Sequence, residues 1–130
     1  MVLYHNVLNI ERLKSILESG FIFKDKQILK PCVYMTRDFQ YLKSRGIRMV
    51  FNRDKLKYNY KIKCFCYRGW SILNNQKFIP KNDESEERVF NDVDISRTCV
   101  RIDIDKNKFK EINFKHPLIN HTFEFNKNYR

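Results

Sequence analysis

The sequence predicts an α+β domain dominated by antiparallel sheet, because one strong helical pattern stands among six or so short β-prone runs. The helix is expected between Asn9, a favourable N-cap, and Gly20, which supplies a left-handed stop. From Thr98 to Ile104, apolar and polar residues alternate as they do in a half-buried strand. The apolar stripe of the helix consists of Ile10, Leu13, Ile16 and Leu17.

The other strands are expected where β-prone runs are bounded by turn residues or charged connections. A short helix is expected over 38–45, with Phe39 and Leu42 facing inward and Gly46 ending it. Residues 53–59 are interpreted as a charged connection, and the tail over 109–125 holds shorter alternating pieces. The expected strands cover 2–5, 32–36, 47–52, 60–67, a run beginning near 87, and 98–104.

Size and composition favour one folded domain over residues 1–130, with a core over about 2–104 and C-terminal strands within 105–130. The 42% hydrophobic and 15% aromatic content excludes a disordered basic tail. No apolar run approaches the ~18 residues of a membrane span, and the N-terminal residues lack the pattern of a signal peptide. We therefore expect a cytoplasmic protein without a membrane partner.

The cysteines do not predict a metal site. Their spacing lacks the two well-spaced pairs that a structural zinc site needs. Reduced, partly buried thiols of an intracellular protein are the expected state. The four residues are Cys32, Cys64, Cys66 and Cys99, and we assign no metal to them.

The net charge of +11 comes almost entirely from residues 43–81, which hold eleven Lys and Arg residues against one acid, Asp54. A nucleic-acid groove combines such cations with rings that stack on bases. A strand pair with rings inward and lysines outward gives the same pattern, and an acidic protein surface would be attracted by the same field. The interleaved aromatic residues are Tyr58, Tyr60, Phe65, Tyr67 and Trp70.

Several polar residues occupy positions that packing alone does not explain. Each also has a structural interpretation: a surface histidine, an N-cap with an ion pair, or a solvated acidic loop. They are His5 at the end of the first strand, Asn6 and Asn9 beside the entrance of the helix, Tyr34, Thr36 and Arg37 at the end of a later strand, and Glu84, Glu86 and Glu87 just before another.

Taken in order, these residues resemble the ADP-ribosyltransferase superfamily in its small bacterial and phage-type form. The resemblance covers roughly residues 3–104 and implies two small, mainly antiparallel sheets that form a cleft, with one or two short helices. It also implies NAD as co-substrate. The matching stretches are Leu3-Tyr-His5 with the helix after it, Val33-Tyr-Met-Thr-Arg-Asp38, Phe51-Asn-Arg-Asp-Lys-Leu56, and Glu84-Ser-Glu-Glu-Arg-Val-Phe90.

The resemblance implies binding roles for five residues. A histidine on the first strand of that family hydrogen-bonds a ribose of NAD, which corresponds here to His5, with Asn6 beside it. Tyr34 and Thr36 would line the nicotinamide pocket, although the family's Ser-Thr-Ser motif is absent. Arg37 would face the pyrophosphate, where a planar cation binds two oxygens at once.

The resemblance also implies a catalytic glutamate, which usually stands second in a Glu/Gln-x-Glu motif that opens a strand. Glu86, with Glu84 before it, fits that spacing, and Glu87 fits the first position of the strand, so both stay candidates. Cleavage of the nicotinamide–ribose bond passes through an oxocarbenium-like species, which a nearby carboxylate stabilises.

The predicted activity is therefore mono-ADP-ribosyl transfer from NAD to a macromolecular acceptor, with release of nicotinamide. The acceptor would be a host or defence protein, or a nucleic acid, recruited by the basic segment 43–81. The alternative is a non-enzymatic basic module that binds nucleic acid or protein, such as an inactive inhibitor with the same fold. A tRNA 2′-phosphotransferase relative would need a larger array of phosphate-binding arginines.

Overall fold

The computed structural model of the chain describes residues 1–26, 30–38, 41–66 and 85–125. These residues confirm the α+β class: seven strands form one sheet, and two short strands, β2 and β7, form a separate ribbon. The ribbon strands are β2 (Phe21–Ile22) and β7 (Val93–Asp94). The strands of the large sheet are β1 (Val2–Asn6), β3 (Val33–Thr36), β4 (Ile47–Asn52), β5 (Ile62–Cys66), β6 (Ser85–Val89), β8 (Cys99–Ile104) and β9 (Ile119–Asn120).

The helix α1 (Ile10–Ser19) forms where its caps predicted it. The Asn9 side chain accepts a hydrogen bond from the Arg12 amide at 2.8 Å, which satisfies one of the free donors of the first turn. Gly20 ends the helix at φ 81°, in the left-handed region that glycine enters without strain, and its amide donates to the Ile16 carbonyl. Leu13 and Ile16 point from this helix into the core.

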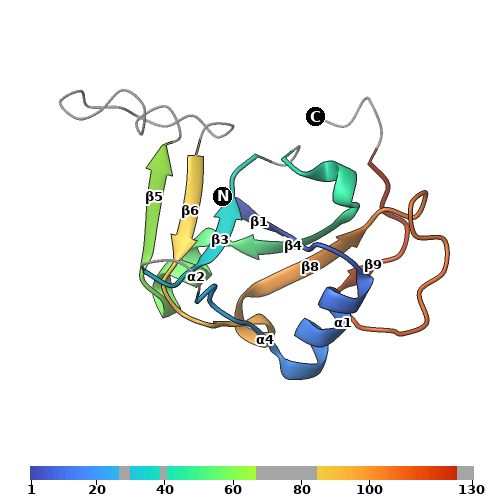
Figure 1. Cartoon of the computed structure of the whole chain (residues 1–130), viewed down its shortest axis with the longest axis horizontal. Helices are drawn as coiled ribbons and strands as arrows, with labels where there is room; N and C mark the ends of the chain where they lie inside the picture. Colours follow the sequence, from blue (N-terminus) through green and yellow to red (C-terminus); the bar gives the residue numbers. More distant parts are fainter. Residues whose placement is uncertain (27–29, 39–40, 67–84, 126–130) are drawn as a thin grey trace.

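The large sheet has the order β5-β6-β3-β1-β4-β8-β9, and its only parallel pair among the described strands is β8 with β9. Strand β1 pairs with β4 over five positions but with β3 only at Tyr4↔Thr36. The β5-β6-β3 half therefore separates from the β1-β4-β8-β9 half beyond this pair. Figure 1 shows β5 and β6 standing at a steep angle to β4 and β8. The expectation of two small sheets is thus corrected to one seven-stranded sheet with two diverging halves and a separate two-stranded ribbon.

Two local predictions were wrong. Residues 53–59 are not a connection but the helix α2 (Arg53–Asn59), because Asn52 accepts hydrogen bonds from two amides of its first turn and Leu56 is buried. Of the helix expected over 38–45, only a 3₁₀ turn, η1 (Lys43–Arg45), forms in the described part, and Leu42 has a left-handed φ of 54°. Phe39 lies outside the described residues.

The later elements also differ from the prediction. Strand β6 begins at Ser85 rather than near Glu87, so Glu86 lies on the strand as well. A short helix, α4 (Ile95–Thr98), precedes β8 and is capped by Asp94. Of the C-terminal strands expected within 105–130, the described residues contain only β9.

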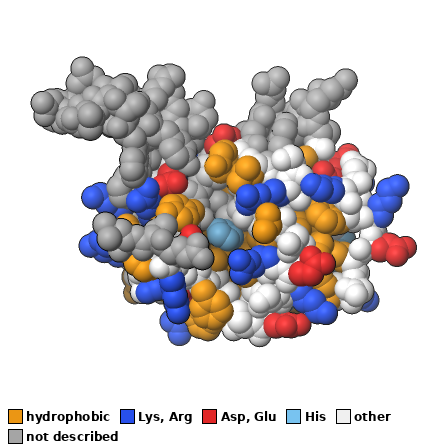
Figure 2. Space-filling model, in the orientation of Figure 1, with side chains coloured by type: hydrophobic (Ala, Val, Ile, Leu, Met, Phe, Trp, Pro, Cys, Tyr) orange, Lys and Arg blue, Asp and Glu red, His pale blue; other side chains and the backbone are white. Residues whose placement is uncertain are grey.

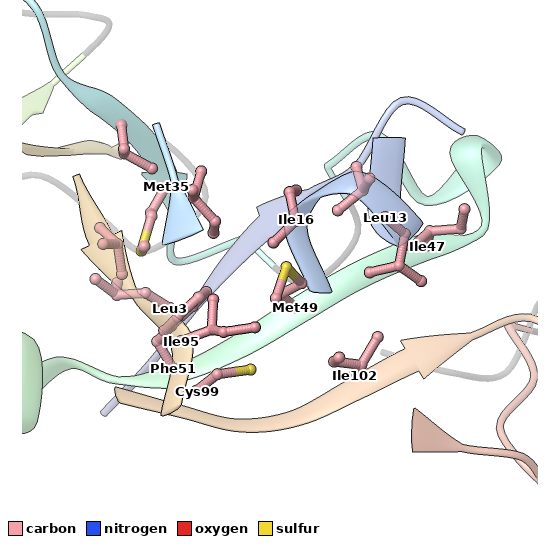
Figure 3. Packing of buried hydrophobic residues seen from close by; sticks show 14 of the residues in the cluster. Leu3, Leu13, Ile16, Met35, Ile47, Met49, Phe51, Ile95, Cys99 and Ile102 are labelled. Atoms are coloured by element: carbon pink, nitrogen blue, oxygen red, sulfur yellow. The ribbon is translucent and has the colours of Figure 1, made fainter. Parts of the chain in front are cut away.

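The hydrophobic core fills the space between α1 and one face of the sheet. Figure 3 shows Leu13 and Ile16 of α1 above Met49 of β4, with Leu3, Phe51 and Ile102 beside them. Because side chains alternate along a strand, the residues between these positions face the other side of the sheet. That second face carries Tyr4 of β1, Tyr34 of β3 and both Glu86 and Arg88 of β6.

One arginine of the basic segment is buried on this second face. Arg48 is 1% exposed, and its Nε donates to Oδ2 of Asp103, itself fully buried, at 3.3 Å. Its guanidinium carbon lies 4.4 Å from the ring centre of Tyr4 and 4.6 Å from that of Phe125. The Phe123 ring is 5.2 Å away, so three rings and one carboxylate replace water around this cation.

Substitution Asp103→Asn is expected to lower the free energy of unfolding by about 3–5 kcal/mol, because it leaves the charge of Arg48 buried without its counterion. The matched control is Arg101→Gln, which removes the 42% exposed partner of the same carboxylate and should cost less than about 1 kcal/mol. Chemical denaturation measures both. Equal losses for the two variants would show that the Arg48–Asp103 pair does not support this face.

Candidate active site

A cavity of about 430 Å³, here called cavity 1, opens on the second face of the sheet between β1, β3 and β6. It brings together five of the seven predicted site residues from three strands that are far apart in the sequence. The five are His5, Asn6, Tyr34, Thr36 and Glu86. The rest of its lining consists of Tyr4, Met35, Tyr41, Leu42, Arg45 and Arg88.

The His5 ring spans the gap between β1 and β3. Its Nδ1 lies 2.8 Å from the Tyr34 carbonyl oxygen. Because a carbonyl only accepts, Nδ1 carries the hydrogen, and Nε2 of the neutral ring is left as an acceptor. Burial lowers the pKa of His5, and the nearby positive charges of Arg12 and Arg45 act in the same direction. The ring is therefore held neutral, in one tautomer, at the edge of the cavity.

Glu86 projects into cavity 1 from β6, opposite Thr36 of β3. Its Oε2 accepts a hydrogen bond of 2.6 Å from Nε of Arg88, two residues further along the same strand. The two side chains are 16% and 20% exposed, so this ion pair lies in the wall of the cavity rather than in bulk solvent. The guanidinium of Arg88 also lies 5.5 Å from the ring centre of Tyr34.

Glu87 and Arg37 lie together on the opposite face of the sheet and do not line cavity 1. Glu87 is fully buried, and its Oε1 accepts from Nε and Nη2 of Arg37 at 2.9 and 2.7 Å. Nε of Arg53, the first residue of α2, donates to the same oxygen at 2.9 Å. Arg37, which was expected at the pyrophosphate, and Arg53 of the basic segment are thus bound to a buried carboxylate, and Glu87 does not line the cavity that Glu86 lines.

A second cavity of about 620 Å³, cavity 2, adjoins the first and shares His5, Asn6, Tyr34 and Arg45 with it. The two cavities meet where β1 and β3 diverge. Cavity 2 is bounded by α1 and by the segment after it, whose Phe21 and Phe23 rings stack with centres 6.1 Å apart. Its cationic lining consists of Arg12, Lys24, Lys26 and Arg45. This second cavity therefore combines exposed rings with positive charge.

The described cysteines are poor nucleophiles. Cys32, Cys64 and Cys99 are free, and burial raises the pKa of each, to about 12 for Cys99. For Cys64, the negative charge of Glu87 adds to this effect. No group of three or more His, Cys, Asp or Glu side chains in the described part of the chain is arranged to hold a metal ion.

The described part of the basic segment does not form one continuous surface. Arg48 and Arg53 are held by buried carboxylates, and Arg45 lines both cavities. Tyr58 is 91% exposed on α2, whereas the Tyr60 hydroxyl accepts a hydrogen bond from the Asp94 amide. Figure 2 shows Lys and Arg side chains over several parts of the visible face. The exposed lysines of the segment are Lys55, Lys57, Lys61 and Lys63, and its residues 67–81 lie outside the described residues, as does Glu84.

Sequence reasoning missed three residues of this site. Arg88 follows Glu86 by two positions, so strand alternation alone would have placed both on one face. Arg45 was identified only as part of the basic segment and Arg12 was not identified, because nothing in the linear pattern shows that both lie near His5.

Comparisons with protein-family models, with curated proteins and with solved structures gave no match for this chain. Among the described residues, no helix has the length and apolar character needed to cross a membrane. The two cavities are therefore the features of the structure that bear on function.

The lowered pKa of His5 predicts a specific pH dependence of stability. In the unfolded chain this histidine takes up a proton near pH 6.5, whereas in the folded chain it does so only at lower pH. The free energy of unfolding should therefore decrease as the pH falls below about 6.5. Denaturation of wild type and His5→Gln from pH 8 to pH 5 tests this. The difference between their free energies of unfolding should stay constant above pH 7. Below pH 6.5, the free energy of unfolding should fall more for the wild type than for His5→Gln. Parallel curves over the whole range would contradict a buried neutral His5.

Proposed function

We propose that this protein is an NAD-dependent mono-ADP-ribosyltransferase in which Glu86 is the catalytic carboxylate. The observation that carries the proposal is the meeting of His5, Tyr34, Thr36 and Glu86 in one cavity, adjoining a second cavity with cations and rings. The diverging halves of the sheet create this cleft, in line with the resemblance noted in the sequence. The proposal is supported by this arrangement of residues and not by similarity to a known protein.

The two cavities together fit the parts of a dinucleotide. The nicotinamide and its ribose would occupy cavity 1, against Tyr34 and Thr36, with Glu86 at the sugar. The bare Nε2 of His5 would accept a hydrogen bond from a ribose hydroxyl at the junction of the cavities. Cations suited to a diphosphate and two rings suited to an adenine line cavity 2, namely Arg12, Lys24, Lys26, Arg45, Phe21 and Phe23.

The chemistry follows from the placement of one carboxylate in a cleft. When the bond between C1′ and the nicotinamide nitrogen breaks, its electron pair stays on nicotinamide, which leaves neutral, and positive charge develops on the ribose. Glu86 stabilises that charge and orients the 2′-hydroxyl. A nucleophilic nitrogen or oxygen of the acceptor then bonds to C1′ and releases its proton to solvent. Arg88 holds the Glu86 carboxylate in place before the substrate arrives.

The structure favours Glu86 over Glu87 on physical grounds. A carboxylate that stabilises a sugar cation must reach it, whereas Glu87 is fully buried and already accepts hydrogen bonds from two arginines. Arg37, expected at the pyrophosphate, has instead a structural partner in Glu87, and Arg45 and Arg12 occupy positions nearer to His5. Glu87 and Arg37 are therefore assigned to folding in this proposal.

The second candidate function is a non-enzymatic module that binds nucleic acid or an acidic protein. The exposed Lys55, Lys57 and Lys61 with the almost fully exposed Tyr58 favour it, since cations beside a free ring suit a polyanion with bases. It predicts binding without any effect of NAD. A neutral His5, fixed in one tautomer and lining the same cavity as Glu86, has no role in such a module.

Substitution Glu86→Gln is expected to reduce nicotinamide release from NAD by about 100-fold or more, because the amide keeps the shape but not the charge that stabilises the sugar cation. Nicotinamide is measured by chromatography, with water as the acceptor and with added cell lysate. NAD affinity, measured by calorimetry, should change little.

Two matched variants complete this test. Glu18→Gln, on the exposed surface of α1, should retain wild-type turnover. Glu87→Gln should lower the melting temperature, since it removes the counterion of Arg37 and Arg53. Wild-type turnover in the Glu86 variant, or a wild-type protein that neither binds nor cleaves NAD, would refute the proposal.

A further inference from the structure

Two of the cations that line cavity 2 lie at its junction with cavity 1. Arg45 lines both cavities, and Arg12 lines cavity 2 from the first turn of α1. The positive charges of both act on the ring of His5, which also lines both cavities. The two arginines are therefore close to the place where a dinucleotide would pass from one cavity into the other.

The other two cations of cavity 2 accompany its aromatic rings. Phe21 and Phe23, whose ring centres are 6.1 Å apart, are here called the ring pair, and Lys24 and Lys26 follow them in the same segment. The Lys24 amide donates to Oδ1 of Asp92 at 2.8 Å, which fixes the backbone directly after the ring pair. All four of these lining residues belong to cavity 2 and not to cavity 1. Positive charge thus lies next to the surface on which we place the adenine.

The four cations have no counterion in the part of the chain that the structure describes. No ion pair or side-chain hydrogen bond there engages any of them, namely Arg12, Arg45, Lys24 and Lys26. Asp25 is the one acid among the described residues that line cavity 2, and it has a further interaction of its own. Because four positive charges around one cavity repel one another, a ligand with several negative charges binds there more favourably than a ligand with few.

We infer that cavity 2 binds an adenosine diphosphate whose ribose carries a 2′-phosphate, and that the proposed transferase therefore prefers NADP to NAD. The diphosphate would take the two arginines near His5, because guanidinium groups match pairs of phosphate oxygens. With the adenine on the ring pair, the adenosine ribose lies between the adenine and the diphosphate. A phosphate on its 2′-oxygen is then directed toward the adenine end, where Lys24 and Lys26 line the cavity.

The lining of cavity 2 does not suit an unphosphorylated ribose equally well. Sites that select NAD commonly use a carboxylate that accepts a hydrogen bond from the 2′-hydroxyl, whereas a cation accommodates a 2′-phosphate. Here the carboxylate available in the described lining, that of Asp25, stands between Lys24 and Lys26 in the sequence. A phosphate adds about −1.5 to −2 charge near neutral pH, so it gains more from these two lysines than a hydroxyl does.

The inference rests on the proposed function only for the reaction that the bound dinucleotide undergoes. The bond that breaks is still the one between C1′ and the nicotinamide nitrogen, and its electron pair leaves on nicotinamide. The acceptor forms the new bond to C1′, and the 2′-phosphate moves with the transferred group. Because Glu86 lines cavity 1 and not cavity 2, the phosphate changes the affinity for the donor rather than the chemistry at the carboxylate.

Calorimetric titration of the full chain at one salt concentration tests the preference directly, by comparing NADP with NAD and 2′,5′-ADP with 5′-ADP. The 2′-phosphate should tighten binding about tenfold or more in both comparisons, since it adds charge-assisted contacts. Equal affinities, or no binding of 2′,5′-ADP, would overturn the inference. The isomer 3′,5′-ADP carries the same charge and should bind more weakly than 2′,5′-ADP, and equal or tighter binding would overturn the assignment to the 2′ position.

Variants separate the two groups of cations. Lys24→Gln and Lys26→Gln should each weaken NADP binding roughly three- to tenfold and change NAD binding less than about twofold. Arg12→Gln should weaken both dinucleotides by a similar factor, because both carry the diphosphate. The matched control is Lys14→Gln, which removes a charge from the exposed surface of α1 outside both cavities and should leave both affinities unchanged. Equal weakening of NADP and NAD by the two lysine variants, or an equal effect of Lys14→Gln, would contradict the inference.

Nicotinamide release distinguishes a failure of this inference from a failure of the proposed function. Release from NAD with a kcat/KM equal to or higher than that from NADP overturns the inference alone. Binding of 2′,5′-ADP that depends on Lys24, in a protein that releases nicotinamide from neither dinucleotide, supports the phosphate site and refutes the transferase. More efficient release from NADP, with the advantage lost in Lys24→Gln, supports both.

Discussion

The buried carboxylate of Glu87 connects the parts of the molecule on which the candidate site depends. Arg37 follows β3, Arg53 opens α2 after β4, and both donate to the same oxygen of Glu87 on β6. A buried carboxylate is costly unless it is paired, so this arrangement strongly disfavours any pairing of β6 that would turn Glu87 outward. A shift of one residue would exchange the two faces of the strand. The ion pairs on one face therefore hold Glu86 toward cavity 1 on the other.

The second constraint is the short contact between β1 and β3. Because these strands pair only at Tyr4↔Thr36, backbone groups beyond that position need other partners, and the His5 ring supplies one for the Tyr34 carbonyl. The same separation joins the two cavities. The separation of β1 from β3 thus creates the cleft. His5, which bonds to the Tyr34 carbonyl across this separation, is also the residue proposed to contact the ribose. Arg12 and Arg45 beside it help to keep this histidine neutral.

Much of the fold could be predicted from local sequence. The α1 helix has both caps and an apolar stripe within a few residues, so it is specified by its own segment. The alternation of polarity predicted the strand β8 but not its burial, since Val100 is 38% exposed and Asp103 is fully buried. The α2 helix was not predicted because its many charged residues were interpreted as a connection. The signals for a helix were the Asn52 N-cap and one apolar residue, Leu56, which is buried. Burial of Arg48 was not predictable, since its partners Asp103, Phe123 and Phe125 come from distant segments.

The site, too, could be predicted only as far as local sequence specifies it. Strand position could place His5, Tyr34 and Glu86 as candidates, but it could not separate Glu86 from Glu87, because the choice depends on where β6 begins and on two arginines distant in sequence.

The most direct test of the account is a titration with NAD followed by backbone amide chemical shifts. We predict changes concentrated at His5, Asn6, Tyr34 and Glu86, on the cavity side of the sheet. Changes centred on Arg37 and Arg53, or none at saturating NAD, would contradict it.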